Sequence, residues 1–377
     1  FGKGRFMWMG FELNSIIGVQ EDYVFFERLF NNSIKWLMYF PIAYVRDWPT
    51  GYEAAAVVAP VLTNDVNNIN NVLPILKSEG ISATFFMDTQ TAGNNKELVR
   101  KISSYGEIAA LVDIGYLASV NDKFNKLNSY EEQLKKLTTA KSELEKISSS
   151  TVSGFLPYYG LFDQNTLNAV INANYKYVFT DSLTDRSVPK TIIRGDNRIV
   201  TMTKTARDDY EIIRDFGLTL PQFQFYTYQE DLDRVLFEGG MYILKLHTEY
   251  QCRSDYSNTI KDVIKDLKKK KFWIATANEI QKWYEKRDYI EIKADRRGNT
   301  RVALKVSNPG VESINNLVID LDLNDYAQNI AIGSEIIGTK TASIKHTEGS
   351  QMVYLYIDDL KPGESRQYYI DYDKVAN

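Results

Sequence analysis

Between residues 47 and 287, apolar segments of strand length alternate with segments of helical periodicity, and this alternation limits the fold more than any other feature. The apolar run AAAVVAPVL at 54–62 precedes the helical segment NVLPILKSEG, whose final residue, Gly80, suits a helix C-cap. The same order recurs in ISATFFM and KELVRKISSYG, where Gly106 is expected to cap a second helix, and continues through EIAALVDIG, SYEEQLKKLTTAKSELEKI, GFLPYYG, KYVFTDS, MYILKLHTEY and KFWIATANEI. Repeated strand-then-helix order predicts a parallel sheet, and the number of repeats favours a barrel over an open sheet.

The segment at 129–147 gives the clearest helix signal. Ser129 and Glu132 have the spacing of a capping box, in which each side chain bonds the other's backbone N–H. The apolar residues of this segment fall on one stripe, which predicts a helix packed against the sheet: Tyr130, Leu134, Leu137, Leu144 and Ile147.

A different pattern begins after Arg287. The segments RVALKVSNPG, LVIDLDL, QMVYLYI and SRQYYIDYD alternate polar and apolar residues with period two, and NPG and KPGES separate them as turns. We therefore predict an α/β barrel at 47–287 followed by a small antiparallel β-sandwich at 288–377. The sandwich is expected to fold as a unit of its own.

The first residues cannot form a core by themselves. Residues 1–13 have the pattern of a strand, and 22–38 have that of a helix with one buried face. A lone strand and helix must dock on something else, so 1–46 is treated as a separate segment. This segment resembles the last strand and helix of a glutamine-amidotransferase-like domain, which implies that further protein preceded Phe1.

Composition excludes several classes of partner. The net charge of −4 argues against nucleic acid, because phosphate binding needs a basic face. No run approaches the length of about 18 apolar residues that a membrane-spanning helix needs. A single cysteine, Cys252, rules out an intramolecular disulfide and a cysteine-rich metal site.

A carboxylate follows the first buried strand of the repeat. In LTNDVNN at 62–68, Asp65 lies where the strand emerges, and Asn67 comes two residues later. Parallel α/β folds place their chemistry just beyond the carboxyl ends of their strands. This loop therefore has the position of an active-site edge.

Several segments together resemble the polysaccharide deacetylase domain, also called the NodB-homology domain or carbohydrate esterase family four. ATFF in ISATFFM is the most specific local match, and GFLPYYG, KYVF, GGMYILKLH and KFWIATANEI follow in the family's order. The resemblance covers about residues 48–287. It implies a distorted (β/α) barrel that removes acetyl groups from glycans with a divalent metal held by one Asp and two His, a catalytic Asp base and a His acid.

Transferring these roles to the matching positions gives an incomplete site. Asp65 falls on the catalytic base and His247 on the acid. The three metal-ligand positions hold Asn67, Leu111 and Gly115, and Leu156 stands where an Arg that orients the base belongs. The resemblance therefore implies that the metal site is lost and that no cofactor is bound.

The number of histidines supports this conclusion. The chain has two, His247 and His346, and the second lies in the predicted sandwich, so a shift in alignment cannot provide two imidazoles at one metal. A zinc site made of Asp65, Asp113, His247 and Glu249 is an alternative without a recognised ligand spacing.

Each candidate residue also has a purely structural interpretation. Asp65 could cap the following helix, and His247 could be a hydrogen-bonded core histidine at a strand end. Candidate glycan contacts are Tyr158, Tyr159, Asp181 and Trp273, although aromatic residues in a barrel often belong to the core, and Asp181 could simply belong to a turn.

These observations predict a catalytically impaired deacetylase-like protein, extracellular or in the cell envelope. Its preferred function is glycan binding, or a structural part in a surface assembly, with self-association through the sandwich or residues 1–40. The alternative is an active deacetylase or other glycan hydrolase that uses Asp65 and His247 without the usual metal.

Overall fold

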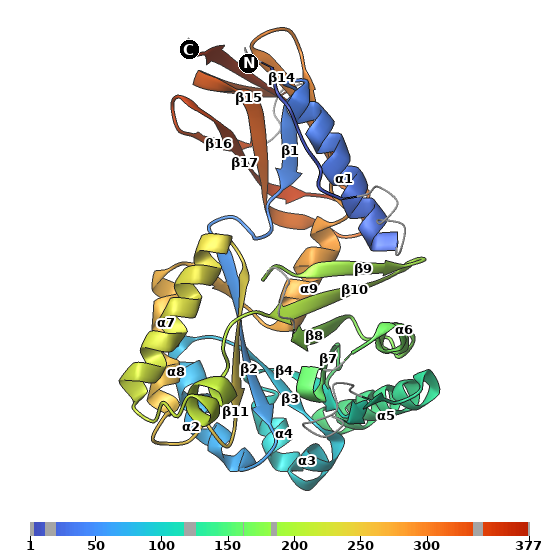
Figure 1. Cartoon of the computed structure of the whole chain (residues 1–377), viewed down its shortest axis with the longest axis vertical. Helices are drawn as coiled ribbons and strands as arrows, with labels where there is room; N and C mark the ends of the chain where they lie inside the picture. Colours follow the sequence, from blue (N-terminus) through green and yellow to red (C-terminus); the bar gives the residue numbers. More distant parts are fainter. Residues whose placement is uncertain are drawn as a thin grey trace. The chain divides into compact units, whose positions relative to one another are not determined.

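The computed structural model describes residues 4–11, 20–116, 126–160, 162–181, 187–334 and 342–375. The chain divides into two compact units (Figure 1). The barrel unit is Gly51–Lys282, and the second unit, here called the strand unit, joins Phe1–Thr50 to Trp283–Asn377. The sequence-based division instead kept residues 1–46 apart from the C-terminal strands.

The barrel unit is built on one curled sheet that forms a half-barrel. Among the described residues it has nine strands in the order β11-β2-β3-β4-β7-β8-β10-β9, with β12 also beside β2. The paired strands are parallel except for the β9–β10 hairpin. Every residue of β2 is buried, as expected for a parallel strand covered on both faces. The strands are β2 (Ala54–Leu62), β3 (Ala83–Met87), β4 (Gly106–Val112), β7 (Gly154–Pro157), β8 (Tyr177–Asp181), β9 (Lys190–Arg194), β10 (Asn197–Lys204), β11 (Met241–His247) and β12 (Phe272–Ile274).

Helices cover this sheet in two groups. In one group α8 contacts α2 and α7, and in the other α5 contacts α3, α4 and α6 (Figure 1). Apolar residues on one stripe explain the packing of α8, which buries Ile260, Val263, Ile264 and Leu267. The helices are α2 (Ile69–Glu79), α3 (Thr89–Asn94), α4 (Lys96–Ile102), α5 (Tyr130–Ser148), α6 (Gln164–Asn172), α7 (Pro221–Glu238), α8 (Ser257–Lys269) and α9 (Ala277–Arg287).

The local sequence signals for helix ends are confirmed at two positions and wrong at one. Gly80 caps α2 with φ of 60°, and Ser129 forms the capping box of α5 with Glu132. Gly106 does not cap a helix. It begins β4, where a Cβ would lie 1.9 Å from the carbonyl oxygen of Ala83, so the missing side chain permits close approach of the two strands.

One acid is partly buried at the start of β4. Glu107 accepts hydrogen bonds from the Tyr177 hydroxyl and, at 2.8 Å, from the backbone N–H of Asn278 in the first turn of α9. Burial raises the pKa of Glu107 to about 7, although these hydrogen bonds oppose the shift. The fold therefore holds a carboxyl group whose ionisation differs between the folded and unfolded chain.

The strand unit is an antiparallel sheet in which the two halves of one long strand, β15, pair with different neighbours. The first part of β15 pairs with β17 and, at Ile319–Asp322, with β1, whereas Ala327–Ser334 pairs with β18. The register shifts between these two parts, so β15 is irregular where it changes partners. The strands are β1 (Ile42–Val45), β13 (Glu291–Arg296), β14 (Arg301–Ser307), β15 (Ile314–Ser334), β16 (Ser343–His346), β17 (Ser350–Leu360) and β18 (Ser365–Lys374).

The N-terminal segment supplies both a helix and a strand to this unit. The predicted helix is present as α1 (Gln20–Leu37), but the described part of the predicted first strand, residues 4–11, has no strand structure. The strand that joins the sheet is β1, which follows the helix. Arg287 holds this segment through a 2.7 Å ion pair with Asp47 and a 3.0 Å hydrogen bond to the carbonyl of Val45. None of the described helices has the length and apolar character required to cross a bilayer.

Candidate functional site

Asp65 lies in the loop that follows β2, in an unusual backbone conformation. Its φ of 48° and ψ of 39° are left-handed, a region that Asp tolerates better than most residues. It precedes a short 3₁₀ turn, Val66–Asn68, but its side chain makes no capping hydrogen bond and is exposed. Capping therefore does not account for this carboxylate.

His247, the last residue of β11, forms a buried pair with Asp209. Its Nδ1 lies 2.6 Å from Asp209 Oδ1, and its backbone N–H donates to Asp209 Oδ2 at 2.6 Å. The N–H of Gln251 donates to the same oxygen at 3.1 Å. Asp209 is fully buried and His247 is 3% exposed, so the carboxylate fixes both the imidazole and the turn after β11.

Tyr210 connects this pair to the loop of Asp65. Its ring stacks on the imidazole of His247 with centroids 3.5 Å apart, and its hydroxyl donates to Glu249 Oε1 at 2.7 Å. Thr63, two residues before Asp65, donates to Glu249 Oε2 at 2.8 Å. Burial opposes ionisation of Glu249, but the hydrogen bonds from Tyr210 and Thr63 outweigh it and lower the pKa of the carboxyl. Asp65 and Glu249 line one cavity of about 400 Å³.

A larger cavity lies beyond the carboxyl ends of β3, β4 and β7. Its volume is about 850 Å³, and its lining includes Asp88 after β3, Asp113 after β4, and Tyr158 and Tyr159 after β7. The Tyr158 hydroxyl donates to Asp88 at 3.2 Å, whereas the Tyr159 ring is 65% exposed. Lys135 and Lys136 of α5 add amine groups to the lining. Such a mixture of aromatic, acidic and amine groups suits a polar ligand with apolar ring faces.

The positions expected to hold a metal do not have suitable donors. Leu111 is 3% exposed and is the register partner of Leu156 across β4 and β7, so two apolar side chains occupy this region. Asn67 is exposed, and Gly115 has no side chain. Divalent ions of this kind need imidazole or carboxylate ligands, so these residues do not fit the metal of the resembled family.

The alternative zinc ligands are not assembled either. Asp65 and Glu249 share one cavity, but Asp113 lines the larger one. In the part of the chain that the structure describes, no group of three or more His, Cys, Asp or Glu side chains is placed to hold an ion.

One of the other predicted glycan contacts lies apart from these cavities. Trp273 pairs in register with Ala55 at the amino end of β2, about 23 Å along the strand from the end that leads to Asp65. Asp181 ends β8, and its side chain lies outside the described residues. Tyr158 and Tyr159 are the predicted contacts that the structure brings together.

Sequence reasoning missed the residues that surround His247. Asp209 and Tyr210 lie 38 and 37 positions before it, in a segment to which no motif was assigned, and their contact depends on how a π-helical turn packs against β11. Asp88 was also missed, although it directly follows the strand ATFFM, which is β3. Active-site residues of such folds commonly follow the ends of strands.

Comparison with known proteins agrees with this fold. Residues 60–178 match the family model for polysaccharide deacetylase. A search of curated proteins found no significant sequence match to the chain.

Three solved structures are similar in fold. A polysaccharide deacetylase candidate from Mycobacterium smegmatis has 20% identity and a TM-score of 0.54, over 63% of this chain and 92% of its own. A second candidate, from Pseudomonas aeruginosa PAO1, has 15% identity and a TM-score of 0.53, over 63% and 93%. The allantoinase Puue has 15% identity and a TM-score of 0.52, over 63% and 92%.

At these identities the structural likenesses establish the fold. They confirm the expected deacetylase-type α/β barrel, and the family-model match covers β3, β4 and β7, whose carboxyl ends border the larger cavity. Residues 60–178 are therefore similar to the polysaccharide deacetylase family and lie in a barrel of that fold.

Proposed function

We propose that the barrel unit binds glycan without carrying out metal-dependent deacetylation. The observation on which this rests is the combination of the leucine pair Leu111–Leu156 with the 850 Å³ cavity beside it. Two apolar side chains replace an imidazole and a guanidinium of the resembled site, and such a replacement can leave stability unharmed. The cavity therefore persists, although the imidazole and guanidinium groups that catalysis needs in the resembled family are absent.

The lining of the cavity supports a sugar as ligand. The exposed ring of Tyr159 can stack on the apolar face of a pyranose, and the bond to Asp88 holds Tyr158 beside it. Asp113 keeps its carboxylate at the cavity while Lys136 binds its backbone carbonyl at 2.8 Å. Carboxylate and amine groups then remain as hydrogen-bond partners for hydroxyl and acetamido groups.

An extracellular or cell-envelope location suits a protein that binds polysaccharide, and the strand unit can serve as a contact within a surface assembly. Sheet edges are common sites of strand addition by a neighbour. Residues 1–40 remain a second candidate for self-association.

Ligand titration of matched variants tests the proposal. Tyr159→Ala should weaken binding of an oligomer of N-acetylglucosamine about five- to thirtyfold, since stacking of one ring contributes about 1–2 kcal/mol. Tyr226→Ala on α7 removes a ring that is 58% exposed and serves as the control. Equal affinity of the two variants would show that the cavity is not the glycan site.

A second function is favoured by the His247–Asp209 pair. A histidine 2.6 Å from a buried carboxylate is a common arrangement in general acid–base catalysis. We infer that any residual hydrolysis uses this pair with Asp65. Acetate release from an acetylated glycan, abolished by both Asp65→Asn and His247→Gln, would establish it, and absence of release in the wild type would reject it.

A further inference from the structure

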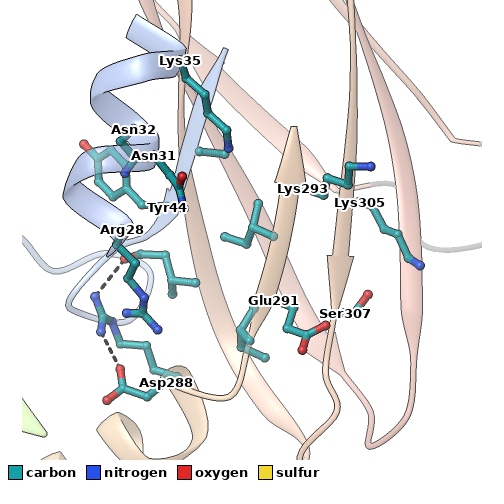
Figure 2. Close-up of a pocket in the computed structure, with 15 residues that line it drawn as sticks. Arg28, Asn31, Asn32, Lys35, Tyr44, Asp288, Glu291, Lys293, Lys305 and Ser307 are labelled. Carbon is teal, nitrogen blue, oxygen red and sulfur yellow. Dashed lines mark hydrogen bonds and ion pairs between the residues drawn. The ribbon is translucent and has the colours of Figure 1, made fainter. Parts of the chain in front are cut away.

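The strand unit contains a cavity that shares no residues with the barrel cavities. Its volume is about 660 Å³, within the range of ligand sites. Helix α1 and strand β1 form one side, and β13 and β14 form the other (Figure 2). The cavity therefore depends on the pairing of the N-terminal segment with the C-terminal strands.

The lining is strongly basic although the whole chain is acidic. It includes five basic and two acidic side chains, a surplus of three positive charges, whereas the chain has a net charge of −4. One of the acids, Asp288, is already paired with Arg287 at 2.8 Å. The charged residues of the lining are Arg28, Lys35, Arg287, Lys293, Lys305, Asp288 and Glu291.

Most of these cations form few or no ion pairs within the described part of the chain. Arg287 forms ion pairs with Asp47 and Asp288. Among the described residues, by contrast, Arg28, Lys35 and Lys305 have no ion-pair partner. Lys293 has one, Asp295, at 3.3 Å, and the Lys293 side chain remains 73% exposed. The cavity thus holds cations that are available to a ligand.

Two of these cations are direct neighbours across the sheet. Lys293 of β13 and Lys305 of β14 are register partners in the antiparallel ladder, and their side chains lie on the same face (Figure 2). Like charges directly opposite each other destabilise a sheet. A feature that works against folding is typical of a functional site, where a bound ligand offsets the repulsion.

The uncharged residues of the lining indicate the kind of ligand. Asn31 and Asn32 present amide groups from α1, and the Tyr44 side chain of β1 is 48% exposed. Amides suit hydroxyl groups, and an exposed aromatic ring suits the face of a sugar. The cations come from a helix and two strands, an arrangement that suits several separated anionic groups better than one compact anion.

We propose that this cavity binds an acidic oligosaccharide, in which carboxylate groups contact Lys293, Lys305, Arg28 and Lys35 while ring hydroxyls contact the asparagines. The proposal does not depend on the function proposed for the barrel unit, because the two cavities have no residue in common.

Titration of the full chain with three probes tests it: an oligomer of galacturonic acid, a neutral oligomer of N-acetylglucosamine, and inorganic phosphate. The acidic oligomer should bind to the wild type, more weakly as salt is raised. The double variant Lys293→Gln/Lys305→Gln should bind it at least tenfold less tightly. The control, Lys265→Gln/Lys269→Gln, removes the same charge from exposed positions of α8 and should bind like the wild type.

Several outcomes would overturn the proposal. An equal loss in the control variant would mean that binding follows net charge alone. Phosphate binding as tight as that of the acidic oligomer would reject a sugar ligand, as would an Asn31→Ala variant with unchanged affinity for the oligomer.

The double variant should bind the neutral oligomer with the same affinity as the wild type. That result would show that the barrel cavity, and not this one, binds the neutral sugar. A melting temperature at least equal to that of the wild type shows that the double variant is folded.

Discussion

Replacing Asp209 by alanine should destabilise the barrel unit more than any ordinary surface substitution. The carboxylate is fully buried and accepts hydrogen bonds from the N–H groups of His247 and Gln251, besides its contact with the imidazole. Each buried donor left without a partner costs about 1–3 kcal/mol. Removing one member of a buried pair costs about 3–5 kcal/mol, so we expect a loss of about 4 kcal/mol.

Urea unfolding followed by circular dichroism measures this loss. Asp262→Ala on α8 removes an exposed carboxylate and should change the free energy of unfolding by no more than about 0.5 kcal/mol. A double-mutant cycle with His247→Leu isolates the pair, for which we expect a coupling of about 1–3 kcal/mol. A loss below about 1 kcal/mol for Asp209→Ala would contradict this expectation and would mean that the freed N–H groups reach water or other partners.

Three further predictions concern metal, catalysis and pH. Chelator-treated protein incubated with zinc or cobalt and then desalted should retain no stoichiometric metal by elemental analysis; one ion per chain, lost in Asp65→Asn, would show that the barrel unit does hold a metal. The triple variant Asn67→Asp/Leu111→His/Gly115→His should release little or no acetate, because Leu156 stands where the resembled family has the Arg that orients the base; rapid release would show that this Arg is dispensable. The raised pKa of Glu107 means that the folded state holds this proton more tightly than the unfolded state, so its contribution to stability is complete below about pH 4.5 and is lost as pH rises towards 7. Across that window the contribution should fall by about 3 kcal/mol, and the difference in unfolding free energy between wild type and Glu107→Gln should change accordingly; a constant difference would mean that the pKa is not raised.

Local sequence patterns predicted much of the barrel because hydrophobic burial along each strand is a local property. The run AAAVVAPVL is the whole of β2, and the capping box at Ser129 begins α5 as expected. The β9–β10 hairpin and α7 were not assigned. The pairing of β1 with β15 was also missed, because it joins residues more than 270 positions apart and no local pattern encodes it.

The candidate site was predicted only in part for a similar reason. Asp65 follows β2 and His247 ends β11, so both can be found from strand ends, but Asp209 reaches His247 only through the packing of a turn. Leu111 and Leu156 were recognised separately as replacements, and their direct pairing across β4 and β7 required the register of the sheet.

We propose that the barrel cavity binds glycan without a metal. Titrating the chain with an N-acetylglucosamine oligomer, once in excess chelator and once with added zinc, tests it most directly. We expect saturable binding with the same affinity in both titrations. Binding that appears only when zinc is present would contradict it.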